Sequence, residues 1–242
     1  MKKTILLAIT IVLSICTLYA KNDEKIKGSG VNTSKEIKLS AFNQIEINAP
    51  IELEVIYGYT HQITLSGDEK FLSLITVDVE NNKLTIKTSR KNINFEDVHA
   101  TVTMPGAVKL LALTGFNSAQ LNVPTDENQF TGSVTGMGNV KISKAKSKQI
   151  TINVAGMASV EVEGEAKNVS ISNSGMGLVN FEHVMAEKVE CNNAGVGLII
   201  VNATESLVAN VGGIGGVVYG GNPKKVVKNI GGLGTVKPMD KK

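Results

Sequence analysis

Hydrophobic and polar residues alternate with a period of two along most of the chain after residue 35. In Val160-Glu161-Val162, for example, two apolar side chains flank one charged side chain. Such alternation places the apolar residues on one face of a β-strand, whereas an amphipathic helix needs a period near 3.6 residues. No segment after Pro105 has a convincing helical period. The pattern therefore predicts an all-β fold.

A glycine followed by a large apolar residue recurs seven times, at intervals of 18 to 21 residues. These glycines are Gly115, Gly136, Gly156, Gly175, Gly195, Gly213 and Gly232. A unit of about 20 residues with short strands cannot bury its own apolar face, but it can do so against similar neighbours. One unit per turn, stacked about 4.8 Å from the next, is a coil of a parallel β-helix. The repeat predicts about seven such coils over residues 106–237.

Stacking of the coils also predicts the role of individual columns of residues. We expect the glycines at sharp corners, where a positive φ is readily adopted only by glycine. Asn173 and Asn193 align in neighbouring coils and are expected to form an inward amide ladder. Cys191 falls in an inward column and is expected to be a buried apolar thiol. We also expect a core stack of the methionines that follow three of the glycines: Met137, Met157 and Met176.

Other repeat folds and glycine-rich motifs fit less well. Leucine-rich repeats need leucine at fixed positions, and leucine is sparse here. Calcium-binding β-rolls need an aspartate that the segment GGIGG at 212–216 lacks. Phosphate-binding loops need a helix after the glycines, whereas strands are predicted on both sides of these. We therefore expect neither a calcium ladder nor a nucleotide site.

The first half of the chain is β-rich but lacks the 20-residue period. We interpret residues 35–105 as a β cap continuous with the helix, because an open solenoid end exposes unpaired backbone groups that must be covered. Asn81-Asn82 predicts a hairpin turn, and Asp68–Leu74 predicts one helical turn. The remaining segments are a polar linker at 21–34 and a tail at 238–242.

The order of these features resembles a known family. The segment FNQIEINAPIELEVIYG at 42–58, the glycine–apolar–glycine repeats and YGGNPKKVVKNIGGLGTVK at 219–237 are similar to the head GIN domain family, whose members are described as putative auto-transporter adhesins. The resemblance covers about residues 38–237. It implies a right-handed parallel β-helix that is exported by bacteria such as Bacteroidetes. It carries over no catalytic residue.

The first twenty residues predict an export signal. MKK supplies positive charge, an apolar run of about fifteen residues follows, and LYA precedes a cleavage point before Lys21. A retained anchor helix and lipid modification at Cys16 are the alternatives, although Ile15 is larger than the residue that lipoprotein peptidases prefer before the cysteine. We expect a cleaved signal peptide at 1–20 and export to the periplasm or the extracellular space.

Removal of Lys2 and Lys3 with that peptide lowers the formal net charge from +3 to +1. A nearly neutral chain lacks the basic footprint of a nucleic-acid-binding protein. No later apolar run reaches the roughly 20 residues of a membrane-spanning helix. Cys191 is then the one cysteine left, which excludes an intramolecular disulfide. We expect no nucleic-acid partner and no membrane segment in the mature chain.

Glu161, Glu163, Glu182 and His183 are the candidate residues of an exposed face. We expect Glu163 and Glu182 at equivalent positions of successive coils, where stacked carboxylates could act as an acid–base pair. The alternative is a solvated acidic surface. The histidines at 61, 99 and 183 lie far apart in the predicted fold, so we expect no metal site and no cofactor.

Three functions fit these observations. The main hypothesis is an exported, non-enzymatic β-helix that presents an interaction surface to polysaccharide or to another envelope protein, with adhesion as one form. The second is a polysaccharide-processing enzyme that uses Glu163 and Glu182. The third is a structural or assembly protein that acts through β-edge pairing, which leaves oligomers open. The sequence identifies no ligand.

Overall fold

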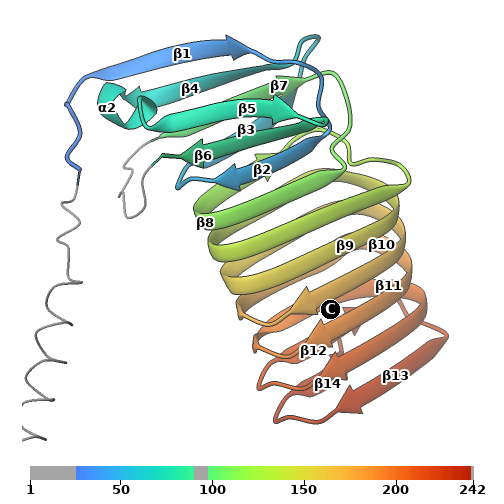
Figure 1. The fold of residues 1–242 in the computed structure, drawn as a ribbon. Coiled ribbons are helices and arrows are strands. Elements are labelled where there is room, and N and C mark those ends of the chain that lie inside the picture. The colour runs from blue at the N-terminus through green and yellow to red at the C-terminus, as the bar shows by residue number, and fades with distance from the viewer. Residues whose placement is uncertain (1–25, 90–97, 241–242) are drawn as a thin grey trace, which may run out of the picture.

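The computed structural model describes residues 26–89 and 98–240 (Figure 1). Strands make up 73% of the chain and helix 2%, which confirms the all-β prediction. The predicted signal peptide at 1–20, with Cys16, lies outside the described residues, as do the last two residues of the predicted tail. The polar segment predicted as a linker is described only from residue 26.

The strands wind into a β-solenoid of about six turns. Most of it consists of four long strands: β8 (Leu110–Leu121), β9 (Gln129–Asn173), β10 (Met176–Asn193) and β11 (Val196–Val211). Three short strands complete the C-terminal end: β12 (Gly216–Gly220), β13 (Lys225–Ile230) and β14 (Thr235–Pro238). Successive turns pair in parallel, so that Val179 lies beside Val160 on one side and Ile199 on the other. The predicted parallel β-helix is confirmed.

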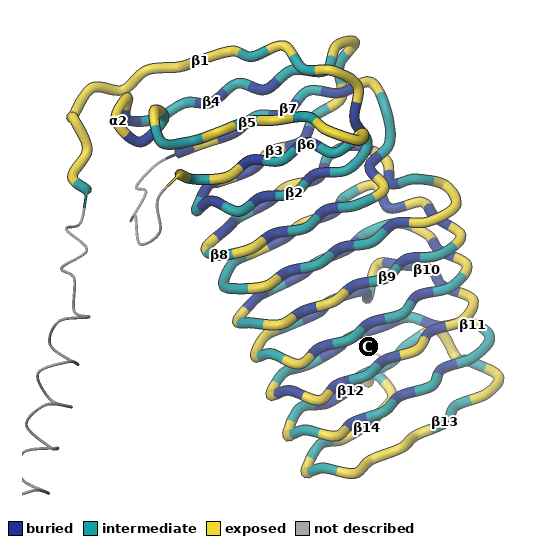
Figure 2. The backbone as a smooth tube through the Cα atoms, viewed as in Figure 1, coloured by how far each residue is buried: buried dark blue, intermediate teal, exposed yellow. Residues whose placement is uncertain are grey.

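Each turn has two strand faces joined by two corners. In the turn that begins at Gly156, the first face contains Val160 and Val162, and the second contains Val169 and Ile171. These four side chains point inward and are at most 3% exposed. Figure 2 shows the same alternation of buried and more exposed positions along every coil. The period of two in the sequence is therefore the alternation between core and surface.

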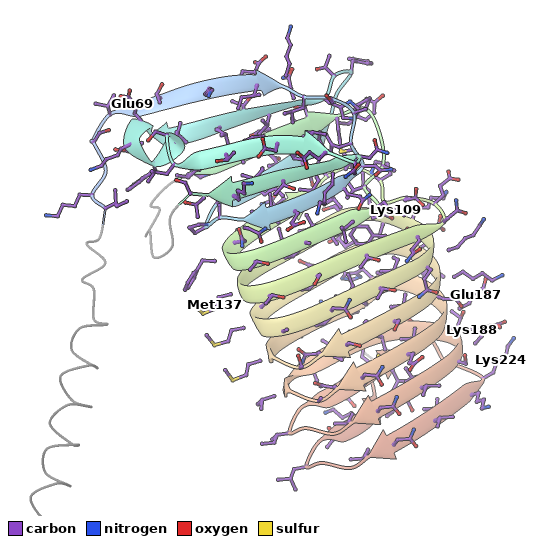
Figure 3. The ribbon with its side chains drawn as sticks, viewed as in Figure 1. Glu69, Lys109, Met137, Glu187, Lys188 and Lys224 are labelled. Carbon is purple, nitrogen blue, oxygen red and sulfur yellow. The ribbon has the colours of Figure 1, made fainter. Side chains whose placement is uncertain are left out.

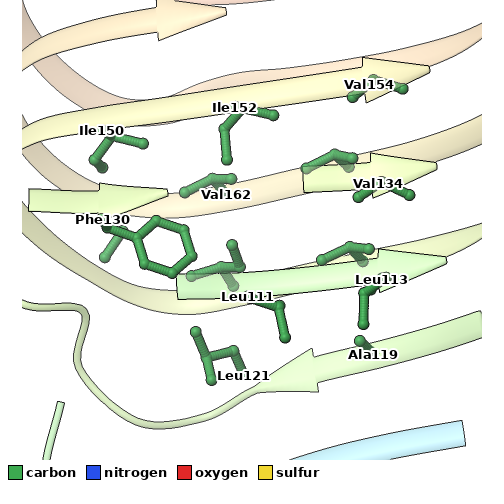
Figure 4. Close-up of a cluster of buried hydrophobic side chains, with 14 of the residues drawn as sticks. Leu111, Leu113, Ala119, Leu121, Phe130, Val134, Ile150, Ile152, Val154 and Val162 are labelled. Atoms are coloured by element: carbon green, nitrogen blue, oxygen red, sulfur yellow. The ribbon is translucent and has the colours of Figure 1, made fainter. Parts of the chain in front are cut away.

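The core is a set of apolar ladders enclosed by the two faces (Figure 4). Phe130 and Ile150 are fully buried, and Leu111, Leu113 and Val162 are at most 2% exposed. Burying one such side chain contributes about 1.5–3 kcal/mol to folding. Because each ladder continues through the neighbouring coils, no coil can bury its apolar side chains without the next one.

The repeated glycines lie at the corner where the chain passes from the second face to the first, here called the glycine corner. A Cβ atom built on Gly156 would fall on the carbonyl oxygen of Gly136, and one on Gly175 would fall on that of Gly156. The expected positive φ is present at Gly115 and Gly136 but at none of the five later glycines of the series. Close approach of successive backbones is thus the more general reason for glycine.

Two buried asparagines support this corner from inside. Asn173 Nδ2 donates to Asn193 Oδ1 at 3.1 Å, and both residues are at most 2% exposed. Asn193 Nδ2 also donates to the carbonyls of Gly197 and Gly216, at 2.9 and 3.1 Å. The predicted amide ladder is confirmed, and it satisfies backbone groups of the glycine corner that would otherwise lie unpaired in the core.

Cys191 lies in the core, opposite Ile171 of the preceding coil. Burial raises the pKa of its thiol to about 12. Since the thiolate is the reactive form, this cysteine is held in an unreactive state. The prediction of a buried apolar thiol is confirmed.

The N-terminal half adds coils that lack the glycine corner. Strand β2 (Gln44–Asn48) pairs in parallel with β8 and with β6 (Lys83–Thr88). Strand β3 (Glu52–Tyr57) pairs in parallel with β8 and with β7 (His99–Met104). Inward residues such as Ile47 and Val55 are fully buried. Residues 44–57 thus form a turn that stacks directly on the repeats.

Antiparallel strands then cover the edges of this end. Strand β5 (Ile75–Glu80) pairs with β6, β4 (Gln62–Asp68) pairs with β7, and β1 (Asn32–Lys38) pairs with β4. The β5–β6 hairpin turns at Asn81 and Asn82, both with positive φ, as predicted. Antiparallel strands end the parallel stacking, so the solenoid does not expose a further parallel edge here.

The predicted helical turn is α2 (Glu69–Leu72), which Asp68 caps. The Asp68 carboxylate accepts hydrogen bonds from the Ser29 hydroxyl at 3.0 Å, from Gly30 N–H at 2.7 Å and from Lys70 N–H at 2.9 Å. Hydrogen bonds from Ser29, Gly30 and Lys70 lower the pKa of Asp68 to about 2. This side chain joins the segment before β1 to the end of β4.

Replacement of Gly175 by alanine tests the close approach of coils. Its Cβ would meet backbone atoms of Gly156, so we expect the free energy of unfolding in urea to fall by about 1–3 kcal/mol, as for overpacking. Gly212→Ala is the matched control at the same corner, because its Cβ would meet nothing within 4 Å. Equal stability of the two variants would contradict the explanation.

Replacement of Asp68 by asparagine tests whether this carboxylate holds the segment before β1 in place. The readout is the pH dependence of the melting temperature. The folded pKa of about 2 lies below the ordinary 3.8, so the carboxylate stabilises the protein above the ordinary pKa and ceases to do so as the pH falls through the folded one. We expect wild type to melt at a higher temperature than the variant near neutral pH, with the two curves converging toward about pH 2. A difference in melting temperature that does not change with pH would contradict this role of Asp68.

Candidate interaction surfaces

Two of the predicted acidic candidates, Glu161 and Glu163, lie around one lysine on the first face. Lys141 Nζ lies 3.0 Å from Glu163 Oε1 and 3.6 Å from Glu161 Oε2. The hydrogen bond with Glu163 and the charge of Glu161 raise the pKa of Lys141 above its ordinary value. All three side chains are 37–45% exposed, and ion pairs this exposed to water contribute little to stability.

The register of the next coil differs from the predicted one. Glu163 lies opposite His183, and the ladder is irregular between Asn180 and His183. One additional residue in that stretch of β10 displaces Glu182 from the column, as a β-bulge does. Its backbone N–H donates to Asn180 Oδ1 at 2.9 Å. The expected equivalence of Glu163 and Glu182 is therefore wrong.

The structure brings Glu161 and Glu163 together through a cation and does not stack two carboxylates. His183 is exposed beside Glu163. The other two histidines lie in the N-terminal half, where His61 packs edge-on against Phe42 and His99 Nδ1 lies 2.9 Å from Glu52. Within residues 26–89 and 98–240, no three His, Cys, Asp or Glu side chains gather as metal ligands would.

The second face carries one outward column of uncharged hydroxyl and amide side chains through successive coils, and it is here called the polar face. This column is Ser133, Asn153, Ser172, Asn192, Asn210 and Asn229, all partly or fully exposed. The neighbouring outward column, Thr131, Thr151 and Ser170, continues into Glu190 and Val208. Ser172 lies beside Asn192, and Asn192 lies beside Asn210. Equivalent side chains therefore repeat once per coil at the strand spacing of about 4.8 Å.

The C-terminal part of the polar face is an ordered amide ladder. Asn210 Nδ2 donates to Asn192 Oδ1, and Asn229 Nδ2 donates to Asn210 Oδ1, both at 2.7 Å. Each amide still has donor and acceptor capacity left, because a side-chain amide can form up to four hydrogen bonds. The ladder thus fixes the orientation of groups that can bind a ligand.

A depression of about 500 Å³ lies at the N-terminal end of the polar face. Gln44, Thr85 and Leu110 line it from β2, β6 and β8, together with Asn81 and four charged residues: Asp78, Glu80, Lys83 and Lys87. Half of its lining is therefore charged. The hydroxyl and amide column of the polar face begins one coil further on, at Ser133, because the coil beside the depression presents Leu110 and Ala112.

The corner opposite the glycines is rich in charged side chains. A shallow hollow of about 520 Å³ there is lined by Lys146, Lys148, Glu165, Met185 and Glu187, among others. Lys146 Nζ lies 3.2 Å from Glu165 Oε1. Figure 3 shows Glu187, Lys188 and Lys224 projecting from this side. Both signs of charge are present, so this corner does not favour one kind of ion.

The glycine corner bears an apolar column on its outer side. We call it the corner ridge: Phe116, Met137, Met157, Met176, Val196, Ile214 and Leu233. Six of the seven side chains are 48–84% exposed, and Met137 is partly buried. Figure 3 shows Met137 pointing away from the coils. The predicted core stack of Met137, Met157 and Met176 is therefore wrong.

The alternation along the strand explains why these methionines point outward. Met157 and the buried Val160 are three residues apart, and positions separated by an odd number lie on opposite sides of a strand. The inward column identified by Val160 therefore already requires Met157 to point outward. Hydrophobicity alone suggested the core, whereas counting from the buried column would have found the ridge.

The family model described as "Putative auto-transporter adhesin, head GIN domain" matches residues 41–223. No curated protein matches the chain. The one helix among the described residues, α2, is four residues long, so no helix there could cross a membrane.

Several solved structures have the same fold. A putative adhesin from Bacteroides fragilis has a TM-score of 0.81 at 24% identity, covering 88% of this chain and 100% of that one. A putative lipid binding protein from Parabacteroides distasonis has a TM-score of 0.70 at 22% identity, with 90% and 100% covered. A putative adhesin from Parabacteroides merdae has a TM-score of 0.61 at 19% identity, with 89% and 99% covered. With three quarters of its length matched by the family model and its solenoid shared with these structures, the chain belongs to the family of putative auto-transporter adhesins with a head GIN domain.

Proposed function

We propose that this chain is an exported, non-enzymatic recognition protein that binds a polysaccharide of the cell envelope or the extracellular space along the polar face. The observation that carries the proposal is the column of uncharged hydroxyl and amide groups that continues from coil to coil, from Ser133 to Asn210. Membership of a family described as adhesins supports a binding role. The N-terminal sequence supports export.

The chemistry of the polar face suits a sugar polymer. Hydroxyl and amide groups both donate and accept hydrogen bonds, as sugar hydroxyls do. A spacing of about 4.8 Å between equivalent groups is close to the length of one sugar unit in an extended chain. Each contact is weak in water, since a hydrogen bond contributes about 0.5–1.5 kcal/mol net. Repetition along several coils adds such contacts within one bound chain.

The acidic cluster supports binding without cleavage. Glycosidases of the usual kind place two carboxyl groups on opposite sides of the bond that breaks. Here Glu161 and Glu163 share Lys141, and Glu182 is displaced from their column. The polar face lies on the other side of the coil from this cluster, so a polymer bound there would not reach these carboxylates.

The test is a binding screen of residues 21–242 against a glycan array and purified polysaccharides, with product analysis for every ligand found. We expect binding without cleavage, and we expect Asn153→Arg to weaken it at least about tenfold, because a long charged side chain interrupts the flat polar column. Gln120→Arg is the matched control, since Gln120 is exposed at an outward position on the first face.

Three results would contradict the proposal. Cleaved product would show an enzyme, and the Glu163→Gln variant would then identify whether the acidic cluster is responsible. Equal losses in both arginine variants would place the ligand elsewhere than on the polar face. No binding to any polysaccharide would exclude this class of ligand and leave an envelope protein as the partner.

A further inference from the structure

The corner ridge is an exposed apolar surface of unusual length for a monomer. Its six well-exposed side chains are 48–84% exposed, which leaves on the order of 600 Å² of apolar surface when about 170 Å² is taken for a large apolar side chain. The largest apolar patch on a typical monomer is roughly 300–600 Å². The ridge is therefore at the upper limit for a surface that remains in water.

The positions beside the ridge are small and uncharged in every coil. Glycine precedes each ridge residue, and glycine, alanine or asparagine follows it: Asn117, Gly138, Ala158, Gly177, Gly197, Gly215 and Gly234. Each large side chain thus lies between two rows of nearly bare backbone. An apolar partner can approach the ridge closely without meeting a charge or a long side chain.

The repeat distance of the corner ridge indicates which kind of partner fits it. Ridge residues of neighbouring coils, such as Met157 and Met176 or Met176 and Val196, are direct partners in the parallel ladder. Their spacing is therefore the strand spacing of about 4.8 Å. A surface that stays in step with all seven positions must have the same period, and a second ridge has it. Two ridges together would bury about 1,200 Å², the lower limit of stable protein–protein interfaces.

We propose that two copies of this chain associate through their corner ridges as an antiparallel, two-fold symmetric dimer. The side chains of one ridge lie against the small-residue rows of the other. The longer side chains, Phe116, Met137 and Met157, are in the N-terminal half of the ridge, and the shorter branched Val196, Ile214 and Leu233 are in the C-terminal half. An antiparallel arrangement pairs a long side chain with a short one throughout. Met176, the fourth of the seven, then lies at the two-fold axis.

The first test is the oligomeric state of residues 21–242 by sedimentation equilibrium. We expect a dimer, and we expect Met176→Glu to raise its dissociation constant at least about 100-fold, because an unpaired carboxylate would be buried at the axis. Met185→Glu is the matched control, since Met185 is 66% exposed at the opposite corner. Met185→Glu should leave the dissociation constant of the dimer unchanged. Both variants should have the melting temperature of the wild type.

A monomeric wild type at high concentration would overturn the proposal, as would a dimer that Met176→Glu does not weaken. Sedimentation with phosphatidylcholine vesicles distinguishes a lipid surface as the alternative occupant. If wild type is monomeric and binds the vesicles while Met176→Glu does not, the ridge is a lipid-binding surface and the dimer is wrong.

The second test is disulfide trapping, which reports the direction of the two ridges. Cys191 is buried, so an introduced cysteine is the one accessible thiol in the described residues. We expect Met176→Cys to form a cross-linked dimer with itself. Phe116→Cys should not cross-link with itself, but it should do so when mixed with Leu233→Cys. Efficient self-cross-linking of Phe116→Cys would show parallel ridges and contradict the antiparallel arrangement.

Discussion

Backbone-to-backbone contact between successive coils is the constraint on which the rest of the structure depends. Parallel pairing holds Val160, Val179 and Ile199 in one column, and at the glycine corner the backbones approach so closely that a Cβ on Gly175 would strike Gly156. Glycine, which has no Cβ, therefore permits this close approach at the corner of all seven repeats. The core ladders, the inward asparagines and the outward columns all follow from this one register.

Because the register fixes every column, each surface of the solenoid is a row of equivalent side chains. The corner ridge repeats one apolar group per coil, and the polar face repeats one hydroxyl or amide group per coil. These two surfaces differ in chemistry and lie at different positions around the coil. A dimer formed through the corner ridge would leave both polar faces uncovered, so self-association and polysaccharide binding are compatible in the same assembly.

The sequence predicted those features that depend on the period itself. The parallel coils, the Asn173–Asn193 ladder and the buried Cys191 all follow from aligning the glycines. The coil at residues 44–57 was not predicted as part of the repeat, because it turns at Ala49 and Pro50 instead of at a glycine and is separated from the next coil by the covering strands. Its pairing with β8 is visible only in the folded structure and not in the sequence.

The two wrong predictions have different physical causes. Met157 was assigned to the core by its hydrophobicity, although its odd separation from Val160 places it outside. Glu182 was aligned with Glu163 by counting residues, and the irregularity before His183 breaks that count. Strand phase was readable from the sequence, whereas an added residue within a strand has no comparable signal. The polar face consists of common hydroxyl and amide residues, so nothing in the sequence distinguishes them. They can be identified only once it is known which polar residues lie on the same side of the coil.

The most direct measurement is the distance between two spin labels on the polar face, at Ala112 and Asn229. Both positions point outward, and six coil-to-coil steps separate them, so pulsed electron paramagnetic resonance should give one narrow distribution near about 30 Å. That result would establish that one repeat advances the chain by one strand spacing along its whole length. A distribution centred beyond about 40 Å, or one without a defined maximum, would be incompatible with in-register coils of this spacing and with every surface described above.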